Sequence, residues 1–253
     1  MIGLPGLIGL VALAVFGVAQ FFLIGTISAG RRPRFRPIPL FTTLRGMLGR
    51  SIESGRELHV SIGTGSIAGE DMATTLAGLQ IVEYLADEAA ASGVAPAITT
   101  ADAAALILAE DTLRRPYIRQ GSLESYPPLS ARLPALEPTQ YAAATMDYLS
   151  HGHVLANVMS GVFGVEAGLM ARAADKDALP QFGGAADPRA LAVLLPTADN
   201  LLVGEEMFAA KAYLQARPPH LASLRAQDIA RWAIVAGTIV LFIIGLLSQA
   251  GQL

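Results

Sequence analysis

Cysteine is absent from this 253-residue sequence, and charged side chains make up only 15% of it. Without cysteine the chain can form no disulfide, no thiolate nucleophile and no cysteine metal site. The charge balance of 18 Lys and Arg against 21 Asp and Glu gives a net charge of −3, so no general basic surface is available for nucleic acid. The hydrophobic content of 53% is higher than an ordinary soluble domain carries. The composition therefore indicates a membrane protein.

An apolar run without any charged residue, LIGLVALAVFGVAQFFLIGTISAG, extends from Leu7 to Gly30. It is long enough to cross the roughly 30 Å hydrocarbon core of a bilayer. A signal peptide would have a basic segment before a shorter apolar run, and a small-residue cleavage site after it. Here the basic cluster RRPRFR (residues 31–36) follows the run. We predict a transmembrane helix over residues 4–30; the alternative is a buried core helix.

A second apolar run, WAIVAGTIVLFIIGLL, lies near the C-terminus, and Ile229 and Ala230 extend it. It predicts a transmembrane helix over residues 229–248, with Trp232 suited to the membrane interface. Arginines 217, 225 and 231 precede this run, as the basic cluster follows the first. Because positive residues stay on the cytoplasmic side, we expect a two-pass protein of the cell membrane with both termini extracytoplasmic and the middle cytoplasmic. The lipid bilayer is thus an expected partner.

Between these runs, strand-like and helix-like segments alternate. Residues 31–57 are expected to form a juxtamembrane linker and an amphipathic helix, and residues 58–216 a cytoplasmic domain. In that domain the strand-like ELHVSIG precedes the helical EDMATTLAGLQIVEYLADEAAASG, and similar units follow from APAITTAD to NLLVGEE. Such alternation predicts an α/β fold with a Rossmann-like, mostly parallel sheet of five or six strands and helices on both faces, flanked by the two transmembrane helices.

Several of these segments, in the same order, resemble a family of bacterial membrane proteins known only as a domain of unknown function. The segments are LHVSIGTGSIAG, ITTAD, GGAADP and LVGEEMFAAKAYL, with AQD just before the last helix. The resemblance spans most of the chain. It implies a membrane-bound Rossmann-like domain and supplies no activity.

The glycine-rich segment after the first predicted strand fits G-x-G-x-x-G/A through Gly63, Gly65 and Ala68. This is the context of a dinucleotide-binding turn. However, the acid expected about 20 residues later falls at Glu83, inside a predicted helix, and the dipeptide ED places negative charge where a pyrophosphate needs positive potential. We therefore favour a tight strand-to-helix corner, and leave an anionic or nucleotide-like ligand and other chemistry as alternatives.

Small or polar residues end nearly every predicted strand, where open α/β sheets bind their ligands. The candidate ligand-binding residues are Gly63, Thr64, Gly65, Ser66, Thr100, Asp102, Gly184 and Glu205. Asn157 is also expected at a strand end. Asp102 and Asp187 fit equally well as helix N-caps, and Pro188 suits the first helical position.

The remaining polar residues give no catalytic set. Glu205 and Glu206 could act as a general base or bind a divalent metal, or simply form the acidic first turn of a helix. His59 is expected to be a hydrogen-bonded core residue. Neither a cysteine nor a third histidine accompanies His151 and His153, so we assign no zinc site. No catalytic residue, metal or cofactor is predicted.

Two functional hypotheses remain. The first is a non-enzymatic membrane protein whose cytoplasmic domain has a scaffolding or assembly role, as a homo-oligomer or with a membrane-complex partner. The second is a nucleotide- or small-anion-binding enzyme that uses the strand ends around Gly63–Ser66 and Glu205.

Overall fold

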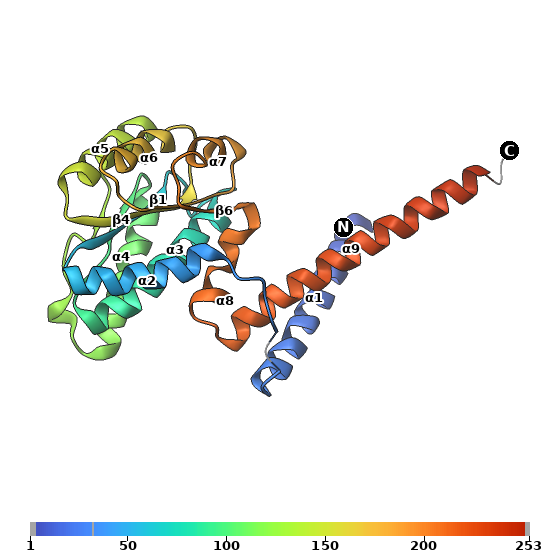
Figure 1. The fold of residues 1–253 in the computed structure, drawn as a ribbon. Coiled ribbons are helices and arrows are strands. Elements are labelled where there is room, and N and C mark those ends of the chain that lie inside the picture. Colours follow the sequence, from blue (N-terminus) through green and yellow to red (C-terminus); the bar gives the residue numbers. More distant parts are fainter. Residues whose placement is uncertain (1–3, 32, 251–253) are drawn as a thin grey trace. The chain divides into compact units, whose positions relative to one another are not determined.

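The structure, a computed structural model, describes residues 4–31 and 33–250 (Figure 1). It divides into two compact units. Residues 37–214 form the first, which we call the α/β unit. The described residues up to Arg36 and from Gln215 onwards form the second, which we call the helical unit.

A six-stranded sheet forms the centre of the α/β unit. Its strands are β1 (Glu57–Gly63), β2 (Ala97–Thr100), β3 (Ala131–Arg132), β4 (Val154–Val162), β5 (Gln181–Ala185) and β6 (Asn200–Val203). The strand order is β3-β2-β1-β4-β5-β6, and every neighbouring pair is parallel. This is the order of the doubly wound dinucleotide-binding fold, so the predicted Rossmann-like α/β class is confirmed.

Helices cover both faces of this sheet. They are α2 (Pro39–Ser54), α3 (Met72–Ser92), α4 (Ala103–Gln120), α5 (Pro138–His151), α6 (Ala167–Lys176), α7 (Pro188–Leu194) and α8 (Ala210–Leu214), with the short 3-10 helices η1 (Leu123–Ser125) and η2 (Gly204–Ala209). Figure 1 shows α5, α6 and α7 on one face and α2, α3 and α4 on the other. Both layers are needed because both faces of a parallel sheet are apolar.

The sequence of β1 explains its central position. Leu58, Val60 and Ile62 are all buried, as are the intervening His59 and Ser61. Tyr141 of α5, Met159 of β4 and Met170 of α6 belong to one buried apolar cluster of the same domain. A strand buried on both faces must be nearly continuous in apolar residues, so the two polar side chains of β1 need partners inside the protein.

Two local predictions need correction. The helix after β1 begins at Met72, not at the acidic dipeptide, which leaves an eight-residue loop from Thr64 to Asp71. Asn157 lies in the middle of β4, which continues to Val162, so it is not a strand-end residue.

The helical unit contains α1 (Leu4–Ser28) and α9 (Pro218–Ala250), which contact one another. Gly9–Ser28 and Pro218–Ser248 are long and apolar enough to cross a membrane, and the most apolar stretch of each has almost no buried residue in the isolated chain. A core helix of a soluble protein would instead be buried. The helix that contains the second predicted span starts eleven residues before the expected boundary at residue 229, and its first turns carry the polar residues His220, Arg225 and Asp228.

Candidate functional site at the carboxyl edge of the sheet

The strand order reverses between β1 and β4, which is where doubly wound sheets bind ligands. The eight candidate residues all lie at the carboxyl edge of the sheet, at or just after the ends of β1, β2, β5 and β6. They do not converge on one point, because β4 separates the β1 and β2 residues from Gly184 and Glu205.

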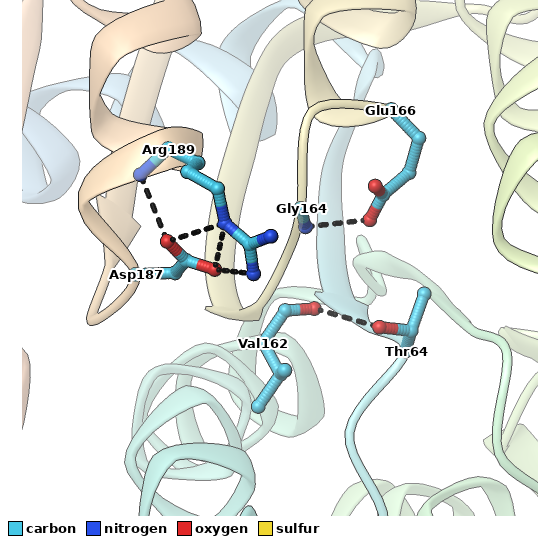
Figure 2. Close-up of polar contacts among 6 residues, drawn as sticks. All are labelled: Thr64, Val162, Gly164, Glu166, Asp187 and Arg189. Carbon is cyan, nitrogen blue, oxygen red and sulfur yellow. Dashed lines mark hydrogen bonds and ion pairs between the residues drawn. The ribbon is translucent and has the colours of Figure 1, made fainter.

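The end of β1 is packed tightly against β4. Gly63 has a φ of +84°, and a Cβ atom there would lie 2.0 Å from the carbonyl oxygen of Val162. The same oxygen accepts hydrogen bonds from Thr64, from the backbone N–H at 2.9 Å and from the side-chain hydroxyl at 3.3 Å (Figure 2). The hydroxyl of Thr64 therefore already has a hydrogen-bond partner within the protein.

Gly65 is held by close contacts and not by an unusual φ. A Cβ atom at this position would lie 2.4 Å from Cγ2 of Val162 and 2.5 Å from Oγ1 of Thr75. Thr75 in turn donates to the carbonyl oxygen of Ser66 at 3.2 Å, and the Ser66 hydroxyl accepts from the Ala68 N–H at 3.2 Å. In a dinucleotide site the second glycine leaves room for the pyrophosphate. Here the protein's own side chains fill that room.

The end of β2 forms a helix cap. The Thr100 hydroxyl donates to the Gly63 carbonyl at 3.2 Å and accepts from the Asp102 N–H at 3.3 Å. Asp102 Oδ1 accepts from the Ala105 N–H at 2.7 Å, so this carboxylate is the N-cap of α4. Of the two roles expected for Asp102, ligand binding or helix capping, its hydrogen bond therefore agrees with helix capping.

The two remaining candidates lie at β5 and after β6. A Cβ atom on Gly184 would lie 3.2 Å from Cβ of Leu202 and 3.3 Å from Cγ of Met207, so this glycine faces packed side chains. Glu205 lies in the first turn of η2 beside Glu206, whose Oε2 accepts from the Val203 N–H at 3.1 Å. The acidic pair thus lies where a helix dipole favours negative charge.

Asp187, Arg189 and Glu166 complete this edge, and the last two were not predicted (Figure 2). Asp187 caps α7 by accepting from the Arg189 N–H at 2.8 Å, and its Oδ2 lies 2.8 Å from Nη2 of Arg189. The Arg189 side chain lowers the pKa of the Asp187 carboxyl group, and the backbone bond adds to this effect. Glu166 Oε1 accepts from the Gly164 N–H at 2.7 Å. The consecutive residues Asp187, Pro188 and Arg189 were the feature of the sequence from which this ion pair could have been predicted.

A pocket of about 310 Å³ opens beside the switch point. Its lining residues are Asp71, Thr74, Val162, Phe163, Ala186 and Asp187. Phe163 and Val162 give it an apolar wall, while Asp71 and Asp187 contribute carboxylates.

Negative charge dominates the loops that form this edge. Residues 64–71, 101–102, 133–137, 163–166 and 186–187 contain six carboxylates and no lysine or arginine: Glu70, Asp71, Asp102, Glu137, Glu166 and Asp187. The basic residues nearest to these loops in sequence are Arg132, which donates to the Leu129 carbonyl oxygen at 2.9 Å, and Arg189, which pairs with Asp187. Such an edge repels phosphates, because anions need positive potential or free N–H donors.

A buried polar cluster crosses the middle of the sheet. His59 Nδ1 lies 2.7 Å from Oδ1 of Asn157, and its Nε2 lies 3.0 Å from Oγ1 of Thr99. Tyr141 bonds to Thr99 at 2.9 Å and also to Ser61. Burial lowers the pKa of His59 to about 4, Arg132 adds to the shift, and the Asn157 bond opposes it. His59 is therefore a neutral core residue, as expected from its apolar strand.

The other two predicted histidines lie apart from this cluster. His151 ends α5, where it pairs with Asp147 at 3.0 Å, and His153 precedes β4. Across residues 4–31 and 33–250, no group of three or more His, Cys, Asp or Glu is arranged to hold a metal ion.

Comparison with known proteins places the chain in a family. Searches of curated proteins and of solved structures found no match. A family model described as "Domain of unknown function (DUF6754)" matches residues 6–252, which is nearly the whole sequence. The chain, with its parallel α/β unit between two apolar helices, therefore belongs to the DUF6754 family of domains of unknown function.

Proposed function

We propose that this protein is a two-helix membrane anchor for a non-enzymatic α/β domain with a structural, scaffolding or assembly role. The observation that carries this proposal is the filled glycine corner. Val162 and Thr75 occupy the space beside Gly65 that a dinucleotide's pyrophosphate would need.

The charge of the carboxyl edge also supports the proposal. Its loops carry carboxylates, and Asp187 neutralises Arg189. Most polar candidates there already have structural partners: Thr64 bonds to β4, Thr100 to β1, and Asp102 caps α4. Groups committed to such bonds are poorly placed to bind and turn over a substrate.

The exposed apolar surface of the helical unit supports membrane attachment and assembly. Large apolar side chains such as Phe21, Phe22 and Trp232 are more than 70% exposed in the isolated chain. Exposing so continuous an apolar surface to water is energetically unfavourable. Lipid or other protein chains must therefore cover it.

The rival function, a nucleotide- or small-anion-binding enzyme, has one observation in its favour. The pocket lined by Asp71, Val162 and Asp187 lies where doubly wound enzymes bind ligands. Two of its polar lining groups are carboxylates, which disfavour a phosphate-bearing ligand.

Two measurements on the full chain extracted in detergent test these functions. Native mass spectrometry should detect a homo-oligomer or a complex with a co-purifying membrane protein. A thermal-shift screen with ATP, GTP, NAD, Mg²⁺ and Mn²⁺ should leave the melting temperature unchanged, because a ligand of the native state stabilises it by mass action. A monomer that is stabilised by a nucleotide would overturn the scaffolding proposal in favour of the rival.

A further inference from the structure

Three arginines from opposite ends of the sequence gather in the helical unit. Arg31 and Arg34 follow α1, and Arg225 lies in the early turns of α9. Together with Leu23, Thr26, Ile27 and Pro33 they line a pocket of about 290 Å³. Contact between α1 and α9 brings these basic residues together although almost 200 positions separate them in the sequence.

The pocket holds positive charge without a compensating carboxylate. None of its lining residues is acidic. Within the described part of the chain, the guanidinium groups of Arg31, Arg34 and Arg225 form no ion pair, whereas Arg231 on the same helix as Arg225 lies 4.0 Å from Asp228. Three unpaired cations around one cavity repel each other, so an anion bound there would relieve that repulsion.

The position of the pocket at the end of an apolar span indicates which anion is available to bind there. Leu23 and Ile27 belong to the last turns of the apolar span Gly9–Ser28, and Arg225 precedes the apolar stretch of α9. This is the level at which lipid headgroups meet a transmembrane helix. Guanidinium groups bind phosphate through paired N–H donors, and the apolar wall of Leu23, Ile27 and Pro33 suits the glycerol and first acyl carbons of a lipid.

We propose that the pocket lined by Arg31, Arg34 and Arg225 binds the phosphate headgroup of an anionic lipid. The inference rests on the membrane attachment proposed above. It goes beyond a general attraction of basic residues to the membrane surface, because it assigns the binding to particular arginines. The same chemistry would accept free phosphate, so the test must distinguish the two.

The test places the full chain in nanodiscs of mixed phosphatidylglycerol and phosphatidylcholine and uses native mass spectrometry to measure which lipid remains bound. The wild-type chain should retain phosphatidylglycerol in preference to phosphatidylcholine. The double variant Arg34→Gln/Arg225→Gln should lose this preference. Its matched control, Arg36→Gln/Arg231→Gln, removes the same charge from the same linker and the same helix, but from residues outside the pocket.

A specific site predicts that the pocket variant loses at least about fivefold more of the preference than the control, since one arginine at a membrane surface contributes about that factor. Equal losses in the two variants would mean diffuse attraction and would overturn the site. If the glutamine variant does not fold, Arg34→Lys/Arg225→Lys keeps the charge and removes the guanidinium forks. It should show a reduced preference, and an unchanged one would contradict the proposal.

Two further experiments distinguish a failure of the lipid-site proposal from a failure of the proposed membrane anchoring. Displacement of phosphatidylglycerol by excess inorganic phosphate, with a phosphate adduct in lipid-free detergent, would identify free phosphate as the occupant and overturn the lipid assignment. Alkaline extraction of cell membranes tests attachment itself. A chain that stays in the membrane without any lipid preference contradicts only this inference, whereas a chain that is released contradicts the proposed anchoring.

Discussion

Gly65 illustrates how a single residue can satisfy a motif without performing its function. The sequence around it fits a dinucleotide-binding turn, yet the absent side chain makes room for Val162 and Thr75. The glycine is required by packing between β1, β4 and α3.

A Gly65→Val substitution should therefore destabilise the α/β unit by about 1–3 kcal/mol, the range for inserting extra atoms into a packed site. Its neighbour gives the control: Ser66→Ala removes one 3.2 Å bond to the Ala68 N–H and should be nearly silent. Denaturant unfolding of both variants, as full chains in detergent, measures the difference. If Ser66→Ala instead abolished a ligand-dependent rise in melting temperature, the anion-binding alternative would be correct.

His59 makes stability depend on pH. Its folded-state pKa of about 4 lies below the ordinary histidine pKa of 6.5, so below pH 6.5 the unfolded chain binds more protons than the folded chain. The stability contributed by neutral His59 should be complete above pH 6.5 and should fall as the pH decreases from 6.5 to 4. The difference corresponds to about 3 kcal/mol.

Unfolding free energies measured between pH 4 and pH 7 test this dependence. The His59→Gln variant should lose this part of the slope, although it will be less stable overall because its partners Asn157 and Thr99 are buried. His151→Gln makes the same chemical change at an exposed histidine and is the matched control variant. A slope that survives in His59→Gln would assign the pH dependence to other groups.

At the scale of single elements, α9 presents a close-packing surface that the chain itself does not use. Ala233 and Gly237 are four residues apart, a spacing at which small side chains allow two helices to approach closely in lipid. A Cβ atom at Gly237 would meet nothing within 4 Å. The position is therefore open to a helix from a neighbouring copy.

Gly237→Leu should accordingly shift the native mass distribution toward smaller assemblies. Gly245→Leu makes the same chemical change farther along α9, also at an open position, and serves as the control. We expect a weaker effect from the control because the residues four positions before and after it, Leu241 and Gln249, are not small. Unchanged mass and thermal stability of Gly237→Leu, in both detergent and lipid, would count against this helix-pairing surface.

For the whole molecule, the arginines next to the two apolar runs predict the orientation in the membrane. Tags at Met1 and Leu253 should be labelled by a reagent outside the cell, and a tag at the exposed Gly121, which ends α4, should be protected. The opposite labelling pattern would reverse the topology. A tag that is labelled only after the membrane is permeabilised controls for reagent access.

The amino-acid sequence by itself determined the elements and their class. Alternation of apolar strands with amphipathic helices predicted the parallel sheet, and the Asp102 cap and the core role of His59 followed from local rules. Such features depend on neighbours in the chain, which a sequence displays directly.

Only the tertiary structure decided which groups meet. That Val162 fills the space beside Gly65, and that Asn157 turns inward to His59, depends on the pairing of β1 with β4, about 100 residues apart. The contact of α1 with α9 likewise creates the arginine pocket. Local sequence patterns cannot reveal these contacts, because strand register and helix packing are set by the whole core and not by nearest neighbours.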